Sequence, residues 1–232
     1  HQEGAGLVIT VDCGISSAAA IAAARADGLK VVVTDHHQPP AKLPVAEAVI
    51  DPHRPGDPYP NKHLAGVGVA FKLAQGLLAK SPLEPRRREA IEKWVLDLVA
   101  LGTVADLMPL TGENRALVKY GLLVLQRARR PGLRALMRVA GIDPVTCDAS
   151  RIGFGLAPRL NAAGRLTHAT YALELLLTRD AGRAEAAARH LNELNAKRQA
   201  VTAEAVAEAK ERLGPLTDED RIIVLDGKWL SG

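Results

Sequence analysis

The sequence predicts an α/β protein built on a parallel β-sheet with flanking helices. Two short apolar runs, Leu7–Val11 and residues 31–33, are rich in β-branched residues, as buried parallel strands are. The segment between them, residues 16–27, is rich in alanine, and Gly28 follows where a helix commonly ends. A strand, a helix and a second strand in this order form one right-handed βαβ unit.

Three further elements extend this core. A third short strand is expected at Ala48–Ile50, before a proline-rich loop at residues 52–58 that cannot be helical. Apolar residues at helical spacing predict helices over residues 66–78 and 89–101. The expected buried side of the second helix carries Ile91, Trp94, Val95, Leu98 and Val99.

The C-terminal part of the sequence is predicted to be helical. Ala181–Leu213 contains no proline and one glycine near its start, and Gly214 and Pro215 follow as a helix stop. Helices longer than about 25 residues are unusual inside compact domains, so we expect this helix to connect two lobes. An apolar run at residues 222–225 predicts a strand after it.

Composition indicates an intracellular globular protein. The chain has 232 residues, of which 47% are hydrophobic, and this is ample for a core. Its two cysteines lack metal-ligand spacing and form no disulfide framework, which favours a reducing compartment. No apolar run approaches the ~20 residues of a membrane span, and no signal peptide is visible. We therefore expect a cytoplasmic protein.

Four metal-binding side chains follow two neighbouring strands. Asp12 comes directly after the first strand, and Asp35, His36 and His37 come directly after the second. The carboxyl ends of parallel strands are where open α/β sheets hold their ligands. Two carboxylates and two imidazoles without a thiolate favour Mn²⁺ or Mg²⁺. Such a site can activate water against a phosphate.

The net charge of +4 is unevenly distributed. Between Glu113 and His168, ten Lys and Arg residues stand against three acidic residues, a local balance of +7. A basic stretch beside a metal site fits a polyanionic substrate such as a nucleic acid, which is bound through its phosphates. For any single arginine, a solvated helix face is the alternative interpretation.

The motifs around these residues resemble those of a known superfamily. Three of them are similar to motifs of the DHH phosphoesterases: Val11-Asp12-Cys13-Gly14, Asp35-His36-His37 and Gly102-Thr103-Val104-Ala105-Asp106. A fourth, GLAPRLNAAGR from Gly155 to Arg165, narrows the resemblance to the RecJ family of single-strand-specific 5′→3′ exonucleases. The similarity extends from about residue 7 to residue 213, nearly the whole chain.

This resemblance implies an activity, cofactors and partners. We expect a two-metal exodeoxyribonuclease that hydrolyses phosphodiester bonds of single-stranded DNA in DNA repair and recombination, with Mn²⁺ or Mg²⁺ as cofactor. A monomer is expected, with single-strand-binding protein and a RecQ-type helicase as partners. A narrow passage between lobes would exclude duplex DNA.

The resemblance also assigns roles to the residues nearest the chemistry. Asp12, His36 and Asp97 are expected to bind metal; for Asp12, capping of the following helix is the alternative. Asp97 lies inside the apolar run of a helix, where a buried carboxylate is costly unless it is paired or bound to metal. Asp35 is expected to orient a ligand or accept a histidine N–H, and His37 to contact the scissile phosphate.

Residues further from the chemistry are expected to bind phosphate oxygens. These are His53, Arg159, Asn161 and Arg165, whose forked guanidinium, amide and imidazole groups suit that task. An ordinary loop histidine is the alternative for His53, and a helix-terminus ion pair is the alternative for the arginines. Asp106 is interpreted as a structural residue that holds the crevice loop.

The ends of the chain differ from the family pattern. Only eleven residues precede Asp12, and they contain no Asp-x-Asp motif of the kind that the family carries upstream. We expect a fragment of a longer protein, with a DHH domain at residues 1–165, a helical region with the connecting helix at residues 166–213, and the start of a second, mostly missing α/β domain of the DHHA1 type at residues 214–232.

Three other functions remain open at this point. A DHH phosphoesterase of oligoribonucleotides or cyclic dinucleotides would share the metal motifs, but is not expected to carry the segment from Gly155 to Arg165. A manganese pyrophosphatase would need a different basic motif near its C-terminus. An inactive relative that serves as a scaffold at replication forks is the non-enzyme alternative.

Overall fold

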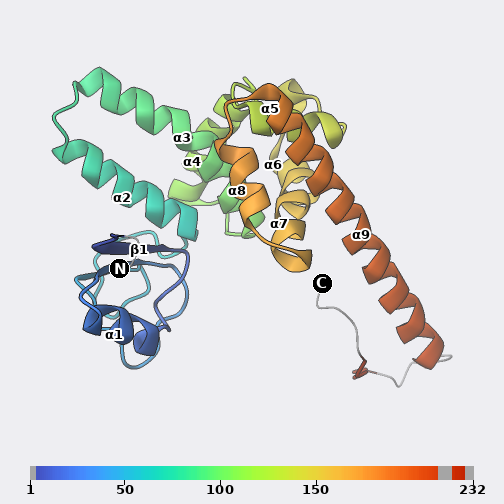
Figure 1. Ribbon diagram of the computed structural model, residues 1–232, viewed down its shortest axis with the longest axis horizontal. Helices are drawn as coiled ribbons and strands as arrows, with labels where there is room; N and C mark the ends of the chain where they lie inside the picture. Colours follow the sequence, from blue (N-terminus) through green and yellow to red (C-terminus); the bar gives the residue numbers. More distant parts are fainter. Residues whose placement is uncertain (1–3, 214–220, 228–232) are drawn as a thin grey trace. The chain divides into compact units, whose positions relative to one another are not determined.

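The computed structural model describes residues 4–213 and 221–227. In order along the chain, the strands and helices of the described residues are β1 (Leu7–Val11), α1 (Ala18–Ala26), β2 (Lys30–Thr34), β3 (Ala48–Ile50), α2 (Gly66–Lys80), α3 (Pro85–Ala105), α4 (Gly112–Leu125), α5 (Pro131–Val139), α6 (Ala149–Arg151), α7 (Ala157–Leu166), α8 (Thr170–Leu177) and α9 (Ala181–Leu213) (Figure 1). A 3₁₀ turn (Pro144–Thr146) precedes α6, and a π-helical segment (Ile152–Leu156) follows it.

The chain divides into two compact units. The first comprises the residues up to Arg127 together with Cys147–Gly153, and the second comprises Ala128–Thr146 and the residues from Phe154 on. The sheet belongs to the first unit, and α5, α7, α8 and α9 belong to the second.

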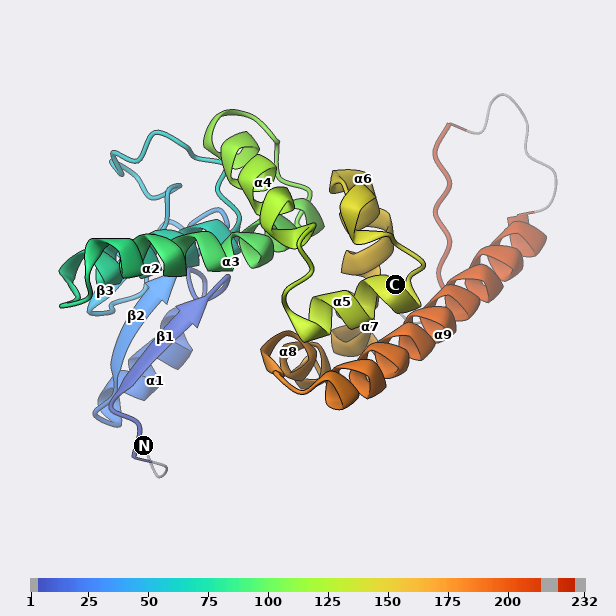
Figure 2. The same ribbon diagram turned by 90° about the horizontal axis from the view of Figure 1, so that it is seen from above.

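The first unit is built on the predicted parallel sheet. Its strand order is β1-β2-β3 with parallel pairing throughout, Val11 lying opposite Thr34 and Thr34 opposite Ile50. Helix α1 covers one face, where Ile21 packs against Val31 and Val33 of β2. Helix α2 lies on the other face, and α3 packs on α2 (Figures 1 and 2). The expected strand, helix and strand are therefore confirmed.

The prediction that both early strands are buried is wrong for β1. Val31 and Val33 of β2 are fully buried, whereas Leu7, Ile9 and Val11 of β1 are about half exposed. The reason is position, because β2 is the central strand of the described sheet and β1 is an edge strand with a single partner. Apolar composition was common to both strands and did not separate them.

Helices α2, α3 and α4 form the second layer of this unit. Leu64, Val69 and Phe71 pack with Val99 of α3 and Leu117 of α4 in one apolar cluster. Helix α3 is longer than predicted, and Ile91 and Trp94 are exposed rather than buried, a correction to the expected buried side. The fully buried residues of α3 all lie in its C-terminal half, from Asp97 on.

The second unit is helical, as predicted. Helix α9 has the predicted bounds and runs without a break past Asn192 and Asn195. Its N-terminal half packs on α5, α7 and α8 (Figure 2), and its last buried residue is Asn195. From residue 196 to residue 213 no residue of α9 is fully buried. The predicted stop at Gly214 and Pro215 lies outside the described residues.

The predicted strand at residues 222–225 is absent from the described residues 221–227, which form no regular secondary structure. Ile222 and Val224 are 87% and 88% exposed. A strand needs a hydrogen-bonding partner, and the described part of the chain provides none there. No helix among the described residues combines the length and hydropathy of a membrane span.

The close packing of α3 and α4 depends on Gly121. A Cβ at this position would lie 2.2 Å from the carbonyl oxygen of Leu96 and 2.5 Å from Cβ of Ala100. We expect Gly121→Ala to lower the free energy of unfolding by about 1–3 kcal/mol, the usual cost of overpacking. Urea unfolding followed by circular dichroism measures this change.

Gly76 on α2 is the matched control, because a Cβ there would meet nothing within 4 Å. Gly76→Ala should be neutral or stabilising by roughly 0.5–1 kcal/mol, since alanine favours the helix. Equal effects of the two substitutions would contradict the close contact assigned to Gly121.

Candidate metal centre

A turn at the carboxyl end of β1 positions Asp12. Its φ of 62° lies in the left-handed region that side chains rarely adopt, while its N–H still donates to the Thr34 carbonyl at 3.0 Å. Gly14 continues the turn with a φ of 109°, and a Cβ there would lie 2.7 Å from Oγ1 of Thr10. That hydroxyl donates to the Cys13 carbonyl at 2.7 Å. Strained backbone of this kind is concentrated at functional sites.

Asp35, at the carboxyl end of β2, binds the surrounding backbone through its carboxylate. Its side chain is 1% exposed and accepts hydrogen bonds from three backbone N–H groups: Ile15 at 2.9 Å, His36 at 2.8 Å and His37 at 3.3 Å. It also bonds Nδ1 of His37 at 2.7 Å. Burial alone would raise the pKa of Asp35, but these hydrogen bonds outweigh burial and hold it below the ordinary value. Asp35 is therefore an ionised carboxylate that orients the two histidines.

His36 places a buried ring nitrogen between two carboxylates. Its side chain is 7% exposed, and Nε2 lies 3.0 Å from Oδ1 of Asp12 and 3.3 Å from Oδ2 of Asp106. Neither approach has the geometry of a hydrogen bond, so Nε2 is a buried polar atom without a hydrogen-bond partner. Buried polar atoms almost always have partners, which marks this position as a binding site for something further.

His37 lies beside His36 and is more exposed. Ligand atoms of Asp12, His36 and His37 all lie within 4.8 Å of one another, and the two imidazole rings are 4.6 Å apart. The hydrogen bond with Asp35 raises the pKa of His37 above its ordinary value; burial opposes this shift, and the charges of Asp35, Asp12 and Asp106 add to it.

Besides Asp12, the carboxylate that lies within reach of His36 is that of Asp106, a residue that was not predicted to bind metal; the predicted residue was Asp97. Asp106 follows the C-terminal end of α3, and its carboxylate lies in reach of His36. Burial raises the pKa of Asp106, an effect that His36 opposes and the charge of Asp12 reinforces. Asp97 is buried on α3 and accepts a hydrogen bond from the Leu98 N–H at 2.8 Å.

Helical phase separates Asp97 from Asp106. Asp97 and Asp106 are nine residues apart, which is about two and a half turns of an α-helix, so they point in opposite directions. A position within an apolar run indicates a carboxylate on the core-facing side of the helix, and on α3 this carboxylate is Asp97. The informative signal was the position of Asp106 at the end of the helix, where a side chain can reach the sheet edge.

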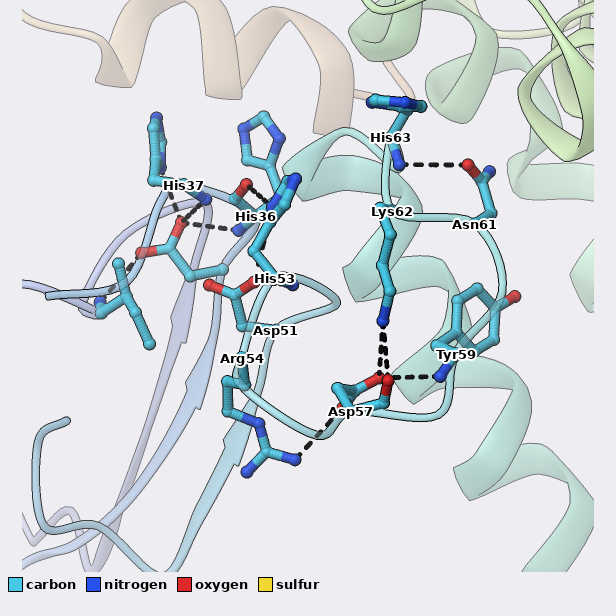
Figure 3. Close-up of polar contacts among 12 residues, drawn as sticks. His36, His37, Asp51, His53, Arg54, Asp57, Tyr59, Asn61, Lys62 and His63 are labelled. Atoms are coloured by element: carbon cyan, nitrogen blue, oxygen red, sulfur yellow. Dashed lines mark hydrogen bonds and ion pairs between the residues drawn. The ribbon is translucent and has the colours of Figure 1, made fainter. Parts of the chain in front are cut away.

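His53 supports the site from the loop after β3. Its N–H donates to Oδ1 of Asp51 at 2.8 Å, and its Nδ1 bonds the His36 carbonyl at 2.7 Å (Figure 3). Asp51 is 1% exposed, and burial raises its pKa. The loop beyond is closed around Asp57, which accepts from the Tyr59 N–H at 2.9 Å and from Arg54 at 3.2 Å. One imidazole nitrogen of His53 thus fixes the backbone that carries His36.

The three predicted phosphate-binding residues of the second unit all lie on α7. Asn161 and Arg165 are exposed and four residues apart, so they share one face of the helix. Arg159 is partly buried: its Nε donates to Asn192 of α9 at 2.9 Å and its Nη1 to the Gly155 carbonyl at 2.7 Å. Burial lowers the pKa of Arg159. Arg159 therefore differs from its two neighbours in joining α7 to α9.

The atoms that converge at His36 fit a divalent metal ion. The carboxylates of Asp12 and Asp106 lie within 3.3 Å of Nε2 of His36, and the imidazole of His37 lies beside them. None of these side chains is a thiol. Oxygen-rich sites with imidazole and without thiolate favour Mn²⁺ or Mg²⁺. A cation would supply the partner that Nε2 lacks and offset the repulsion between Asp12 and Asp106.

This fold and this cluster define a class of protein. Residues 4–103 match the family described as "DHH family, N-terminal domain".

Within that family the chain is similar to the RecJ exonucleases. It is 41% identical over 232 residues to the single-stranded-DNA-specific exonuclease RecJ of Bacillus subtilis (strain 168), a match that covers 100% of this chain and 28% of that protein. It is 45% identical over 207 residues to RecJ of Escherichia coli (strain K12), with 87% and 36% covered. These matches confirm the resemblance inferred from the motifs.

Solved structures agree on the fold. RecJ from Thermus thermophilus in complex with Mn²⁺ has a TM-score of 0.79 and 39% identity, and the match covers 90% of this chain and 30% of that chain. A crystal structure of exonuclease RecJ bound to manganese gives a TM-score of 0.78, with 89% and 50% covered. The chain therefore spans about a third of the curated relatives' length and up to half of a solved chain.

Separate substitution of Asp97, on α3, and of Asp106, just after it, tests which of the two carboxylates binds metal. Asp106→Asn removes a charged ligand, and we expect it to weaken Mn²⁺ binding by roughly 10-fold or more. Asp97→Asn should leave Mn²⁺ affinity near that of the unchanged protein and act on the free energy of unfolding instead. Calorimetric titration with Mn²⁺, beside urea unfolding of the same variants, gives both quantities. The reverse pattern would restore the metal-binding role to Asp97.

The Asp35–His37 hydrogen bond has a measurable pH dependence. Because the pKa of His37 is raised in the folded protein, protonated His37 contributes stability below its ordinary value of about 6.5, and this contribution is lost as the pH rises through the raised pKa. Asp35→Asn should lower the pKa of His37, as measured by NMR titration of the metal-free protein. An unchanged titration would show that Asp35 does not control this imidazole.

Proposed function

We propose that the protein containing this chain is a metal-dependent phosphodiesterase that degrades single-stranded DNA from its 5′ end, in DNA repair and recombination. The observation that carries this proposal is the buried Nε2 of His36 between Asp12 and Asp106, at the strand ends of a DHH-family domain. The single-stranded DNA substrate is the one named for the RecJ relatives, and the 5′→3′ polarity follows the family resemblance of the motifs.

Different residues of the chain have different roles in the proposed reaction. Asp12, His36 and Asp106 would hold a divalent metal ion such as Mn²⁺ or Mg²⁺, and His37 lies beside that site. When bound, that ion supplies Lewis-acid stabilisation of the phosphoryl group and activation of water. Asp35 fixes the orientation of both histidines through its hydrogen bonds. Its effect on the pKa of His37 favours the protonated imidazole, which can donate a charge-assisted hydrogen bond to the scissile phosphate.

The exposed face of α7 is proposed to bind the DNA backbone. Asn161 and Arg165 are exposed there, in the basic stretch between Glu113 and His168. Arginine presents a planar fork of donors that matches two phosphate oxygens. Phosphate contacts of this kind bind any base sequence and weaken as salt increases.

The wider setting belongs to the same proposal. Single-strand-binding protein and a RecQ-type helicase are proposed partners of a monomeric, cytoplasmic enzyme. A second metal ion would require ligands beyond the cluster at His36. Residues 214–232 are proposed to begin a second domain, which α9 would connect to the DHH domain.

Substitution of a metal ligand and of a phosphate-binding residue should have different effects in the full-length protein. Asp12→Ala should abolish cleavage of end-labelled single-stranded DNA and leave DNA binding largely intact, because the carboxylate holds metal and not DNA. Arg165→Ala should weaken DNA binding across all base sequences and reduce the slope of its salt dependence by about 1. Cleavage rates and binding at several salt concentrations measure the two effects.

The choice of substrate distinguishes this function from its alternatives. Single-stranded DNA, duplex DNA and a dinucleotide are compared at equal concentration with Mn²⁺ present, and the single strand should be cleaved fastest. Preference for the dinucleotide would make the protein a small-substrate phosphoesterase. Absence of cleavage of all three would support the inactive scaffold.

A further inference from the structure

Gly66, the first residue of α2, lies directly against the side chain of Asp12. A Cβ at Gly66 would lie 2.2 Å from Oδ1, 2.4 Å from Cγ and 2.5 Å from Cβ of Asp12. Real Cβ atoms do not approach other heavy atoms this closely, so any other residue at this position must displace one of the two partners. The contact joins the helix on one face of the sheet to the carboxylate at the strand end.

The start of α2 is the less movable of the two partners. Leu64 and Ala65, just before Gly66, are each 1% exposed, and Val69 one turn later is also 1% exposed. These residues lie in or beside the apolar cluster of α2, α3 and α4. Close-packed interiors resist displacement, because moving one buried side chain forces its neighbours to move.

The backbone of Asp12 is also held in place. Its N–H is bonded to the Thr34 carbonyl at 3.0 Å, and the turn that follows is tied by Oγ1 of Thr10 to the Cys13 carbonyl at 2.7 Å. The side chain of Asp12 has more freedom, since it is 53% exposed. Rotation of the Asp12 carboxylate toward solvent would relieve the contacts with Oδ1 and Cγ, but the contact with Cβ of Asp12 would remain, so the turn that carries Asp12 must shift as well. Both movements take the carboxylate away from Nε2 of His36.

We propose that Gly66 is a positioning residue of the metal centre: by lacking a side chain, it leaves the space in which the Asp12 carboxylate lies against His36. This inference rests on the proposed metal-binding role of Asp12. Gly66 itself touches neither metal nor substrate. Its contribution is to select the one orientation of Asp12 that points at the ring nitrogen.

Mn²⁺ binding to the full-length protein, measured by calorimetry or by electron paramagnetic resonance without substrate, tests the proposal. Gly66→Ala should weaken Mn²⁺ binding by roughly 10-fold or more, as loss of ligand orientation does. Gly76→Ala lies on the same helix, where a Cβ meets nothing within 4 Å, and should leave Mn²⁺ affinity unchanged. Equal affinities of the Gly66→Ala and unchanged proteins would overturn the proposal.

A second background separates failure of this inference from failure of the metal site. Asp12→Asn should weaken Mn²⁺ binding by itself, and Gly66→Ala should add little to it, because the displaced group no longer serves as a charged ligand. If Asp12→Asn leaves Mn²⁺ affinity unchanged, the proposed metal site is wrong. If Asp12→Asn weakens binding and Gly66→Ala does not, only the positioning role is wrong.

A further variant keeps the test decisive if Gly66→Ala is too unstable to purify. In the double variant Asp12→Gly with Gly66→Ala the clashing side chain is gone, and glycine accepts the left-handed φ of position 12. Recovery of the urea unfolding midpoint in this variant would confirm that Gly66 makes room for Asp12. Continued instability would show that Gly66 accommodates the helix start instead, and would overturn the inference.

Discussion

The hydrogen bonds of the buried Asp35 carboxylate hold the whole strand-end site together. This one side chain accepts from the N–H groups of Ile15, His36 and His37 and bonds the ring of His37. Ile15 belongs to the turn after β1, whereas the histidines belong to the turn after β2, so Asp35 ties two strand ends to each other. A buried carboxylate without these partners would be costly. These hydrogen bonds hold the pKa of Asp35 below its ordinary value, so that the carboxylate stays charged beside the two histidines.

The geometry above Asp35 depends on where side chains are missing as much as on where they are present. Gly14 permits a tight turn beside Thr10, and Gly66 permits α2 to begin next to the Asp12 carboxylate. His36 is then held from behind, because His53 bonds its carbonyl oxygen. Three carboxylates, Asp12, Asp35 and Asp106, approach the histidines from separate elements. Such an arrangement concentrates negative charge in a small volume, which is favourable when a divalent cation shares that volume.

Prediction from the sequence succeeded where local pattern and topology coincide. Asp12 and His36 follow β-branched runs, and parallel strands necessarily bring their carboxyl ends to one edge, so the meeting of these residues follows from the order of elements. For Asp97 the pattern carried no information on helix phase relative to the sheet, and the carboxylate that lies 3.3 Å from Nε2 of His36 is that of Asp106. Asp106 was interpreted as structural because nothing in its local sequence shows that the end of α3 lies beside the strand ends.

The sequence by itself determined the parallel sheet, the bounds of the long helix α9 and the meeting of Asp12 with His36 at one sheet edge. These follow from hydrophobic periodicity, glycine placement and the chirality of βαβ connections. Only the tertiary structure decided that β1 is an exposed edge of the described sheet, that Arg159 donates to Asn192, and that Asp106, just after α3, lies within reach of His36. Each of these features depends on the neighbouring segment that packs against the strand or helix concerned. That neighbour is distant in sequence and is brought close only by packing.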